Sequence, residues 1–158
     1  MKTRMTDNIT PTGIFEIEIM LSHNPDWNHA AANVVAQYQR TEFSTLVASP
    51  AGLATLFDNM NRLDFNHDGR ADAAYGSAYL GLSSRKAITG PKLQKFQTTP
   101  YWFSIALHGT PDSANIGQSN SGGCVHLSAE SLRTLITEGL ATIGTRVTIS
   151  DQDAPTVQ

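Results

Sequence analysis

The chain has one cysteine and no long run of apolar residues, and both scarcities limit what it can be. Cys124 is the only cysteine among 158 residues, so no disulfide forms within the chain and the thiol must be free, buried or used in chemistry. No apolar stretch approaches the roughly 20 residues that span a bilayer. The N-terminal MKTRMTDNITPTG has the charge but not the apolar centre of a secretory signal. We therefore expect no membrane span and no readable signal peptide.

Charged residues are also scarce, and neither sign dominates. Lysine and arginine number 11 against 14 aspartates and glutamates, which gives a net charge of −3, and the basic residues are scattered. This distribution lacks the basic stripe that would neutralise a phosphate backbone, so nucleic acid is excluded as a partner. A hydrophobic content of 40% is typical of a globular domain with one packed core.

Periodicity predicts a mixture of strands and helices. Alternation, or short aromatic and β-branched blocks between turn residues, predicts strands over residues 13–21, 75–82, 101–108 and 144–150. Apolar residues at helical spacing predict helices over residues 28–40, 49–63 and 128–139. Ser49 and Ser128 stand at the expected N-caps, and Gly139 at a stop. We expect a single domain over residues 1–150, with a helical insertion at about 25–75 and a loose tail over 151–158.

The cysteine lies in NSGGCVHLS, residues 120–128, directly behind two glycines. A thiol with an ordinary pKa of about 8.5 is mostly protonated at neutral pH, so a nucleophilic cysteine needs a base or a positive potential nearby. SGGC leading towards a helix offers backbone N–H groups around the sulfur with few side chains in the way, as an oxyanion site requires. The alternative is a small buried hydrophobic residue.

Four segments, in order, resemble the catalytic domain of the L,D-transpeptidases, which are bacterial cell-wall enzymes. They are TPTGIFEI (10–17), YWFSIALHGT (101–110), IGQSNSGGCVHLS (116–128) and LRTLITEGLATIGTRVTI (132–149), about half the chain. The most specific feature is HGT followed by S-x-G-C, from His108 to Cys124. The resemblance implies a mainly β (α+β) fold, a β-sandwich or barrel with two or three helices. The inserted helical pair would flank the active-site groove.

The resemblance also implies a role for each matching residue. Cys124 would be the nucleophile that forms a thioester, His108 its base, and the Gly109 carbonyl the group that orients the imidazole. The backbone N–H groups of Gly123 and Cys124 would face the oxyanion, and Ser121 would shape the loop. The expected substrate is a peptidoglycan stem peptide, with no cofactor for catalysis. A cell-wall substrate implies a periplasmic or extracellular location.

Three departures from the family pattern bear on the substrate groove. Gly122 stands where many members have histidine, which changes the width of the predicted pocket. His126 replaces the usual arginine or asparagine, so the grip on a substrate carboxylate becomes weaker or pH-dependent; a plain wall residue is the alternative. Nine residues precede Thr10, where the family normally has a strand pair, so we expect a trimmed or rebuilt sheet.

A second motif, DFNHDGRAD, has the spacing of a calcium-binding loop. Its candidate ligands are the side chains of Asp64, Asn66, Asp68 and Asp72 and the backbone carbonyl of Arg70. The twelfth position is Tyr75, where a helix–loop–helix site has a bidentate glutamate, so the affinity should be modest. The sequence predicts a structural calcium site. The alternative is a turn, for which Asp, Asn and Gly are favoured residues.

Several functions remain open from the sequence alone. The same site gives an L,D-transpeptidase if an amine takes the acyl group and an L,D-carboxypeptidase if water does. A second hypothesis is a secreted antibacterial effector that uses this chemistry on a rival's wall. A third is a catalytically impaired cell-wall binding module. The acceptor amine and the oligomeric state are not determined by the sequence.

Overall fold

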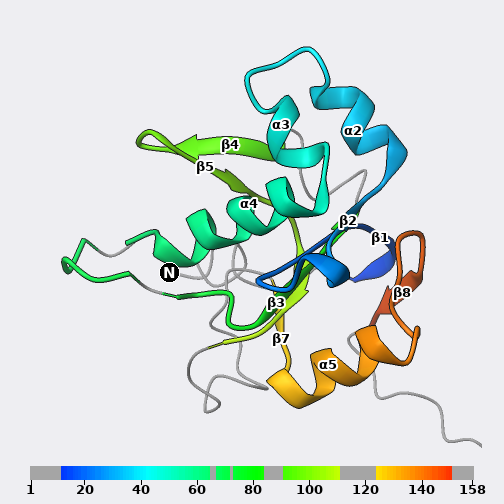
Figure 1. The fold of residues 1–158 in the computed structure, drawn as a ribbon. Coiled ribbons are helices and arrows are strands. Elements are labelled where there is room, and N and C mark those ends of the chain that lie inside the picture. The colour runs from blue at the N-terminus through cyan, green and yellow to red at the C-terminus, as the bar shows by residue number, and fades with distance from the viewer. Residues whose placement is uncertain (1–11, 65–66, 72, 84–90, 111–123, 151–158) are drawn as a thin grey trace, which may run out of the picture.

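The structure is a computed structural model that describes residues 12–64, 67–71, 73–83, 91–110 and 124–150 (Figure 1). Its strands are β1 (Gly13–Ser22), β2 (His29–Ala30), β3 (Ala78–Ser83), β4 (Leu93–Phe96), β5 (Thr99–Trp102), β6 (Ala106–His108), β7 (Val125–His126) and β8 (Arg146–Ile149). Its helices are the 3-10 helix η1 (Pro25–Trp27) and the α-helices α2 (Ala32–Tyr38), α3 (Ser44–Val47), α4 (Pro50–Arg62) and α5 (Ala129–Thr137). The fold is mainly β with α-helices, as the sequence predicts.

The long strand β1 organises a six-stranded mixed sheet of order β2-β1-β3-β6-β7. One edge of β1 pairs antiparallel with β3, and β2 and β8 share its other edge. β6 pairs antiparallel with β3, whereas β7 runs parallel to β6. β4 and β5 form a separate antiparallel hairpin. The sheet is therefore mixed because of a single parallel pair at the β7 end.

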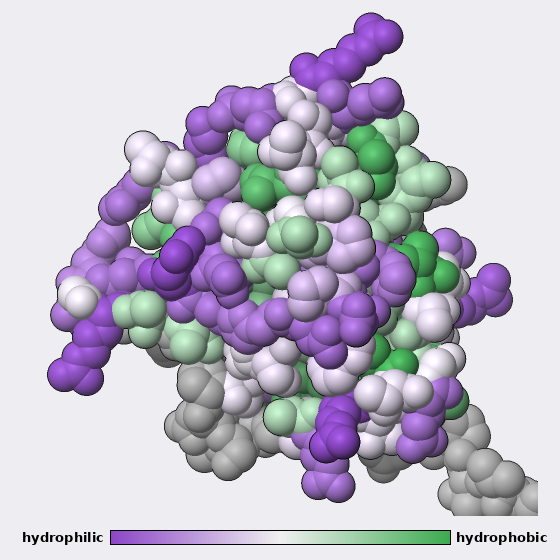
Figure 2. Space-filling model, in the orientation of Figure 1, coloured by the Kyte–Doolittle hydropathy of each residue, from purple (hydrophilic) through white to green (hydrophobic). Residues whose placement is uncertain are grey.

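Each face of the sheet has its own apolar cluster. The first cluster joins α4 to the sheet and the hairpin, and its largest members are Phe57, Leu56, Met60, Tyr79 and Trp102. The second lies under α5 and includes Leu132, Leu80, Leu82, Phe15 and Ile17. Burial of a large apolar side chain stabilises the fold by about 2 kcal/mol, so these two layers hold the sheet. The view in Figure 2 is mostly polar, with small separate apolar patches.

A β-bulge in β1 changes which face its side chains occupy. The register with β3 shifts between Ile17 and Ile19, so Ile17 packs in the second cluster and Ile19 in the first. The alternation of apolar and acidic residues that predicts this strand also predicts one buried and one exposed face, and this part is wrong, since residues 17–22 are all buried. The buried Glu18 is 7% exposed and forms an ion pair with Lys92.

The two capped helices form as the sequence predicts. The hydroxyl of Ser49 accepts the N–H of Gly52 at 3.0 Å, and α4 buries Leu53, Leu56, Phe57 and Met60. The hydroxyl of Ser128 accepts the N–H of Ser131 at 3.0 Å, and Gly139 ends the helical segment with φ of +71°. The closing strand also forms, as β8.

The helix predicted over residues 28–40 is shorter, because Asn28 is used in a tertiary contact. Its side chain accepts the N–H of Ser22 at 2.7 Å and donates to the carbonyls of Ser22 and Pro50 at 3.2 and 3.1 Å. Asn28 is fully buried, the next two residues pair with β1 as β2, and helix α2 begins only at Ala32.

Other predicted elements are corrected by the structure. The strand predicted over residues 101–108 is two strands, β5 and β6, separated at Ser104, and residues 75–77 form a turn before β3. The described residues contain four α-helices, whereas the resemblance implied two or three. The sequence did not predict α3, because its four residues have no strong apolar pattern. The tail predicted over 151–158 lies outside the described residues. None of the helices in the described ranges combines the length and the apolar character needed to cross a bilayer.

Candidate active site

Strands β6 and β7 bring Cys124 and His108 to the same face of the sheet. In the parallel pair, His108 lies opposite His126 and Leu107 opposite Val125. Side chains alternate along a strand, so Cys124, two residues before His126, faces the same side as His108. Cys124 accordingly packs against the first cluster, which also contains Ala106. Residues that are 16 positions apart in the sequence lie one strand apart on the side of α4.

The imidazole of His108 is enclosed by three rings. It stacks on Tyr79 with centroids 5.8 Å apart, meets Tyr75 edge-on at 5.1 Å and lies 4.8 Å from the ring of His126. The residue is only 4% exposed. Burial, with a smaller contribution from the neighbouring His126, lowers the pKa of His108 from 6.5 to about 4, against an opposing effect of the Gly109 carbonyl. The ring is therefore neutral at pH 7.

The backbone of Gly109 orients this neutral ring. Nδ1 of His108 lies 2.5 Å from the Gly109 carbonyl oxygen, which can only accept, so Nδ1 carries the proton and donates. Nε2 is then the unprotonated nitrogen and the basic one. Gly109 is itself fixed by its N–H, which donates to the carbonyl of Ala78 at 3.0 Å. This contact fits the orienting role that the sequence predicts for Gly109, and the catalytic role itself stays a prediction.

The thiol of Cys124 is half-buried and protonated at neutral pH. Sγ donates to the carbonyl of Ser104 at 3.6 Å. Burial raises the pKa of the thiol from 9.0 to about 11, although a hydrogen bond from the backbone of Ala106 acts in the opposite direction. The site at rest therefore holds a neutral thiol and a neutral imidazole rather than a thiolate–imidazolium pair.

A polar network beneath the thiol is a part of the site that the sequence did not predict. The phenol of Tyr79 donates to the Ser104 carbonyl at 3.0 Å and accepts the Ser104 N–H at 3.2 Å. Nε1 of Trp102 donates to the Ser104 hydroxyl at 3.1 Å. Burial raises the pKa of Tyr79 well above 10.0, and the charge of a Cys124 thiolate would add to the rise. Tyr79 thus stacks on the imidazole of His108 and shares the Ser104 carbonyl with the thiol of Cys124.

Gly81 makes room for this network. A Cβ at Gly81 would lie 2.6 Å from Cγ2 of Ile19, 3.0 Å from Nε1 of Trp102 and 3.1 Å from the hydroxyl of Ser104. Any side chain here would displace the indole of Trp102 and the Ser104 hydroxyl that it binds. In the sequence, the network around Ser104 is indicated only by a polar serine between the apolar residues of β5 and β6.

The ring of His126, next to His108, has a buried nitrogen. Its Nδ1 is sealed from solvent and has no hydrogen-bond partner among the described residues. A buried polar atom without a partner costs about 1–3 kcal/mol, so such an atom in a site calls for an explanation. Three further residues of the predicted oxyanion and substrate-binding set, Ser121, Gly122 and Gly123, lie outside the described residues.

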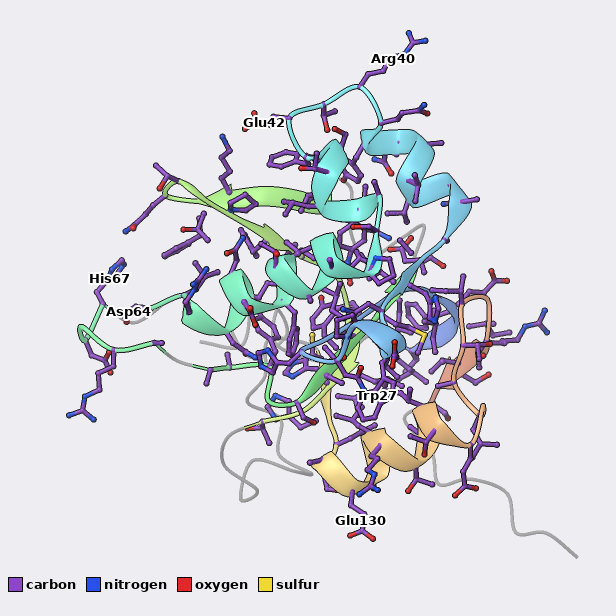
Figure 3. The ribbon with its side chains drawn as sticks, in the orientation of Figure 1. Trp27, Arg40, Glu42, Asp64, His67 and Glu130 are labelled. Carbon is purple, nitrogen blue, oxygen red and sulfur yellow. The ribbon has the colours of Figure 1, made fainter. Side chains whose placement is uncertain are left out.

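The predicted calcium loop lies beyond the end of α4, where Asp64 and His67 project from the molecule (Figure 3). The carboxylate of Asp64 accepts the N–H groups of Asp68 and Gly69 at 3.1 and 2.8 Å, and Asp68 accepts the N–H of Arg70 at 2.9 Å. Asn66 and Asp72 are outside the described residues. Within the described ranges no three histidine, cysteine or acidic side chains are grouped to hold a metal. The calcium site stays a prediction.

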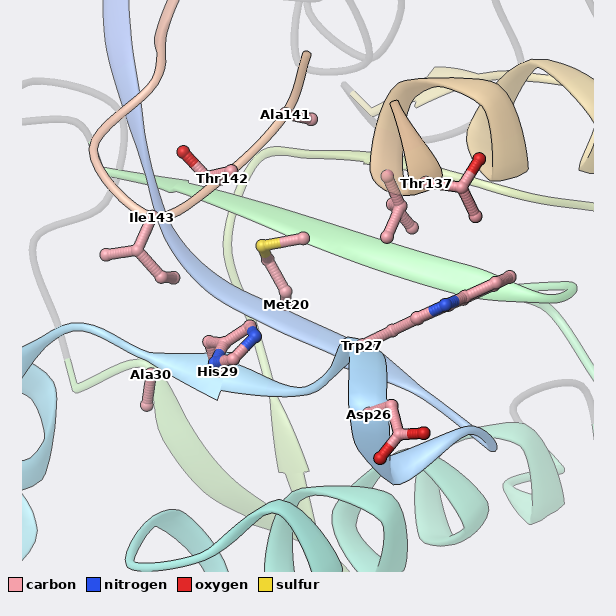
Figure 4. A pocket seen from close by; sticks show the side chains of 10 residues that line it. Met20, Asp26, Trp27, His29, Ala30, Thr137, Ala141, Thr142 and Ile143 are labelled. Atoms are coloured by element: carbon pink, nitrogen blue, oxygen red, sulfur yellow. The ribbon is translucent and has the colours of Figure 1, made fainter. Parts of the chain in front are cut away.

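A separate cavity of about 640 Å³ lies away from Cys124 and His108 (Figure 4). Its walls come from the η1–β2 segment, from Met20 and from the end of α5 with the loop that follows: Asp26, Trp27, His29, Ala30, Ile136, Thr137, Ala141, Thr142 and Ile143. Met20 belongs to the cluster under α5, so the cavity opens near the opposite face and edge of the sheet.

The structure is a mainly β domain in which His108 ends strand β6 and Cys124 directly precedes its neighbour β7. A family model, YkuD, described as the L,D-transpeptidase catalytic domain, matches residues 2–149, so the chain belongs to this family. A curated relative, "Probable L,D-transpeptidase YcfS" of Escherichia coli (strain K12), is 29% identical over 143 residues. The match covers 90% of this chain and 33% of the relative, so the chain spans about a third of that protein's length. No solved structure matches the chain significantly.

The buried His108 predicts an acid-dependent loss of stability. Its pKa is about 4 in the folded chain against 6.5 when unfolded, so between these values the unfolded state binds the extra proton. The contribution of the neutral His108 ring to the free energy of unfolding is complete above pH 6.5. About 3 kcal/mol of that contribution is lost as pH falls towards 4. Urea unfolding between pH 7 and pH 4 should therefore show a smaller loss for His108→Gln than for the wild type. The exposed His29→Gln is the control, and equal losses in all three proteins would contradict the assignment.

The aspartate loop predicts a response to calcium. Ca²⁺ at ten times its Kd stabilises a folded chain by about 1.4 kcal/mol, which raises the Tm of a domain of this size by about 4 °C. We expect this shift in a thermal melt of the wild type, reversed by a chelator and absent in Asp64→Asn. A Tm that responds neither to calcium nor to a chelator would leave the loop as an Asx turn.

Proposed function

We propose that this chain is a cysteine acyltransferase acting on peptidoglycan stem peptides, with Cys124 as the nucleophile and His108 as the base. The observation that carries the proposal is the parallel pairing of β6 with β7, which sets both side chains on one face of the sheet. Membership of the L,D-transpeptidase catalytic domain family supports the substrate class. Because the substrate is a cell-wall polymer, the chain would act in the periplasm or outside the cell.

The first half of the reaction would form a thioester. Sγ of Cys124 attacks the carbonyl carbon of the diamino acid in a tetrapeptide stem, and the thiol proton passes to Nε2 of His108. The imidazolium keeps its Nδ1–H on the Gly109 carbonyl, which stabilises the new charge. Collapse of the tetrahedral intermediate breaks the amide bond, and His108 returns the proton to the departing amine of D-alanine. The backbone N–H groups of Gly123 and Cys124 are the expected oxyanion donors.

The second half would reverse these proton transfers with a new amine. His108 takes a proton from the acceptor amine as it attacks the thioester carbonyl, and the released thiolate of Cys124 regains a proton from the imidazolium. Two stem peptides are then joined by a new amide. Water in place of the amine would give an L,D-carboxypeptidase from the same groups, and the acceptor decides between the two outcomes.

The resting charges argue for proton transfer in step with bond formation. Burial raises the pKa of the thiol to about 11 and lowers the pKa of the imidazole to about 4, so forming a thiolate–imidazolium pair before the attack carries a free-energy cost. Formation of the C–S bond removes this cost, because the sulfur no longer carries the charge. The thiol therefore stays protonated on the Ser104 carbonyl until a substrate carbonyl arrives.

His126 is proposed to contact a substrate carboxylate. Support comes from its place opposite His108 in the β6–β7 pair. A protonated imidazole would form a charge-assisted hydrogen bond that a neutral ring cannot form.

Incubation with purified muropeptides, followed by mass spectrometry, tests the proposed function. The wild type should release D-alanine from tetrapeptide stems or form a dimer linked through two diamino acids. Cys124→Ala should lower turnover by at least about 10³-fold, as loss of a nucleophile does in other acyl-transfer enzymes, with an unchanged fold by circular dichroism. His29→Gln should keep full turnover.

Two outcomes of this experiment would count against the proposal, and a third would narrow its biological role. Unchanged turnover in Cys124→Ala would refute the site. Retention of muropeptides without turnover by the wild type would favour the cell-wall binding module. Cleavage restricted to the stems of another species would favour the antibacterial effector.

A further inference from the structure

Asn61, in the last turn of α4, binds the chain that returns towards the sheet. Its Oδ1 accepts the N–H of Tyr75 at 3.0 Å, and its Nδ2 donates to the carbonyl of Gly76 at 3.0 Å. Its own backbone carbonyl accepts the N–H of Ala73 at 3.0 Å. One residue thus closes the base of the whole connection between α4 and the turn that precedes β3.

The turn held by Asn61 packs directly against His108 and Gly109. The ring of Tyr75 meets the imidazole of His108 edge-on at 5.1 Å. Gly76, with φ of +62°, touches the backbone of Gly109 so closely that a Cβ on Gly76 would lie 2.6 Å from the Gly109 carbonyl carbon. A Cβ on Gly109 would in turn lie 2.9 Å from the N–H nitrogen of Ser77. The turn therefore lies behind the carbonyl group that orients the imidazole.

The side-chain amide of Asn61 is well suited to hold the backbone of this turn. It supplies one acceptor and one donor at the same reach, which fits a backbone N–H and the carbonyl of the next residue. Asn59, two residues earlier on the same helix, has a different environment, since its Oδ1 accepts from Arg62 at 2.7 Å on the exposed side. The two asparagines therefore form a matched pair of test and control.

We propose that Asn61 is a positioning residue for His108. Its two side-chain hydrogen bonds hold Tyr75 against the imidazole and Gly76 against Gly109, so Nδ1 stays on the Gly109 carbonyl and Nε2 stays free for the thiol. The effect on turnover rests on the proposed function, whereas the effect on the imidazole does not.

The surroundings of His108 predict what loss of Asn61 does. The titratable groups that face the imidazole are His126 on β7, Tyr79 on β3 and Tyr75 in the turn, and Cys124 shares the Ser104 carbonyl with Tyr79. Asn61 bonds to Tyr75 alone among them. Release of Tyr75 opens the imidazole to water, and the pKa of His108 then rises towards its ordinary value.

The test compares Asn61→Ala, the milder Asn61→Ser and the control Asn59→Ala by two measurements. An NMR titration follows the His108 ring, and steady-state kinetics with muropeptides separate kcat from KM. In Asn61→Ala we expect the midpoint for His108 to rise by about one pH unit or more, and kcat to fall about tenfold with KM nearly unchanged. For Asn61→Ser, the His108 midpoint and kcat should lie between those of Asn61→Ala and the wild type. Asn59→Ala should match the wild type in both.

The outcomes separate positioning from a merely structural role. A lower Tm with a wild-type titration and a wild-type kcat in both Asn61 variants would overturn the inference. If Asn61→Ala does not fold, the same two measurements on Asn61→Ser decide. A wild type that shows no turnover, combined with a shifted His108 titration in the Asn61 variants, would support the positioning role while refuting the proposed function.

Discussion

The short parallel pairing between β6 and β7 is the constraint on which the site depends. It sets His108 opposite His126 and carries Cys124 onto the same face. A slip of one residue in this register would turn Cys124 to the other face, towards the cluster under α5. The rest of the sheet supports the pairing, because β3 holds β6 through the facing pair of Tyr79 and His108.

Burial keeps both the thiol of Cys124 and the imidazole of His108 neutral. The thiol has a raised pKa and the imidazole a lowered one, since each loses water on the face covered by α4. A neutral pair is less reactive towards adventitious electrophiles than a thiolate, yet it suits an acyl transfer in which bond formation and proton transfer coincide. The carbonyls of Ser104 and Gly109 then hold the two protons at rest.

The sequence predicted the parts of the fold that depend on local pattern. Helix α4 follows from the Ser49 cap and four apolar residues at helical spacing. The motif also led us to expect Cys124 near His108, and the β6–β7 pairing sets them on one face, while their catalytic roles stay a prediction. Local pattern could not predict the shortened α2, because Asn28 bonds to Pro50, 22 residues away. Asn61 was missed for the same reason, since its partners lie 14 and 15 residues further along the chain and a polar residue on a helix normally faces solvent.

Trapping the covalent intermediate tests the central claim most directly. The chain is mixed with a tetrapeptide stem and quenched in acid within the first turnover, and its intact mass and its peptides are measured. We predict an added mass equal to the stem without its terminal D-alanine, located on Cys124, and formed much more slowly in His108→Ala. Turnover that proceeds with no adduct on Cys124, or an adduct on another residue, would contradict the assignment.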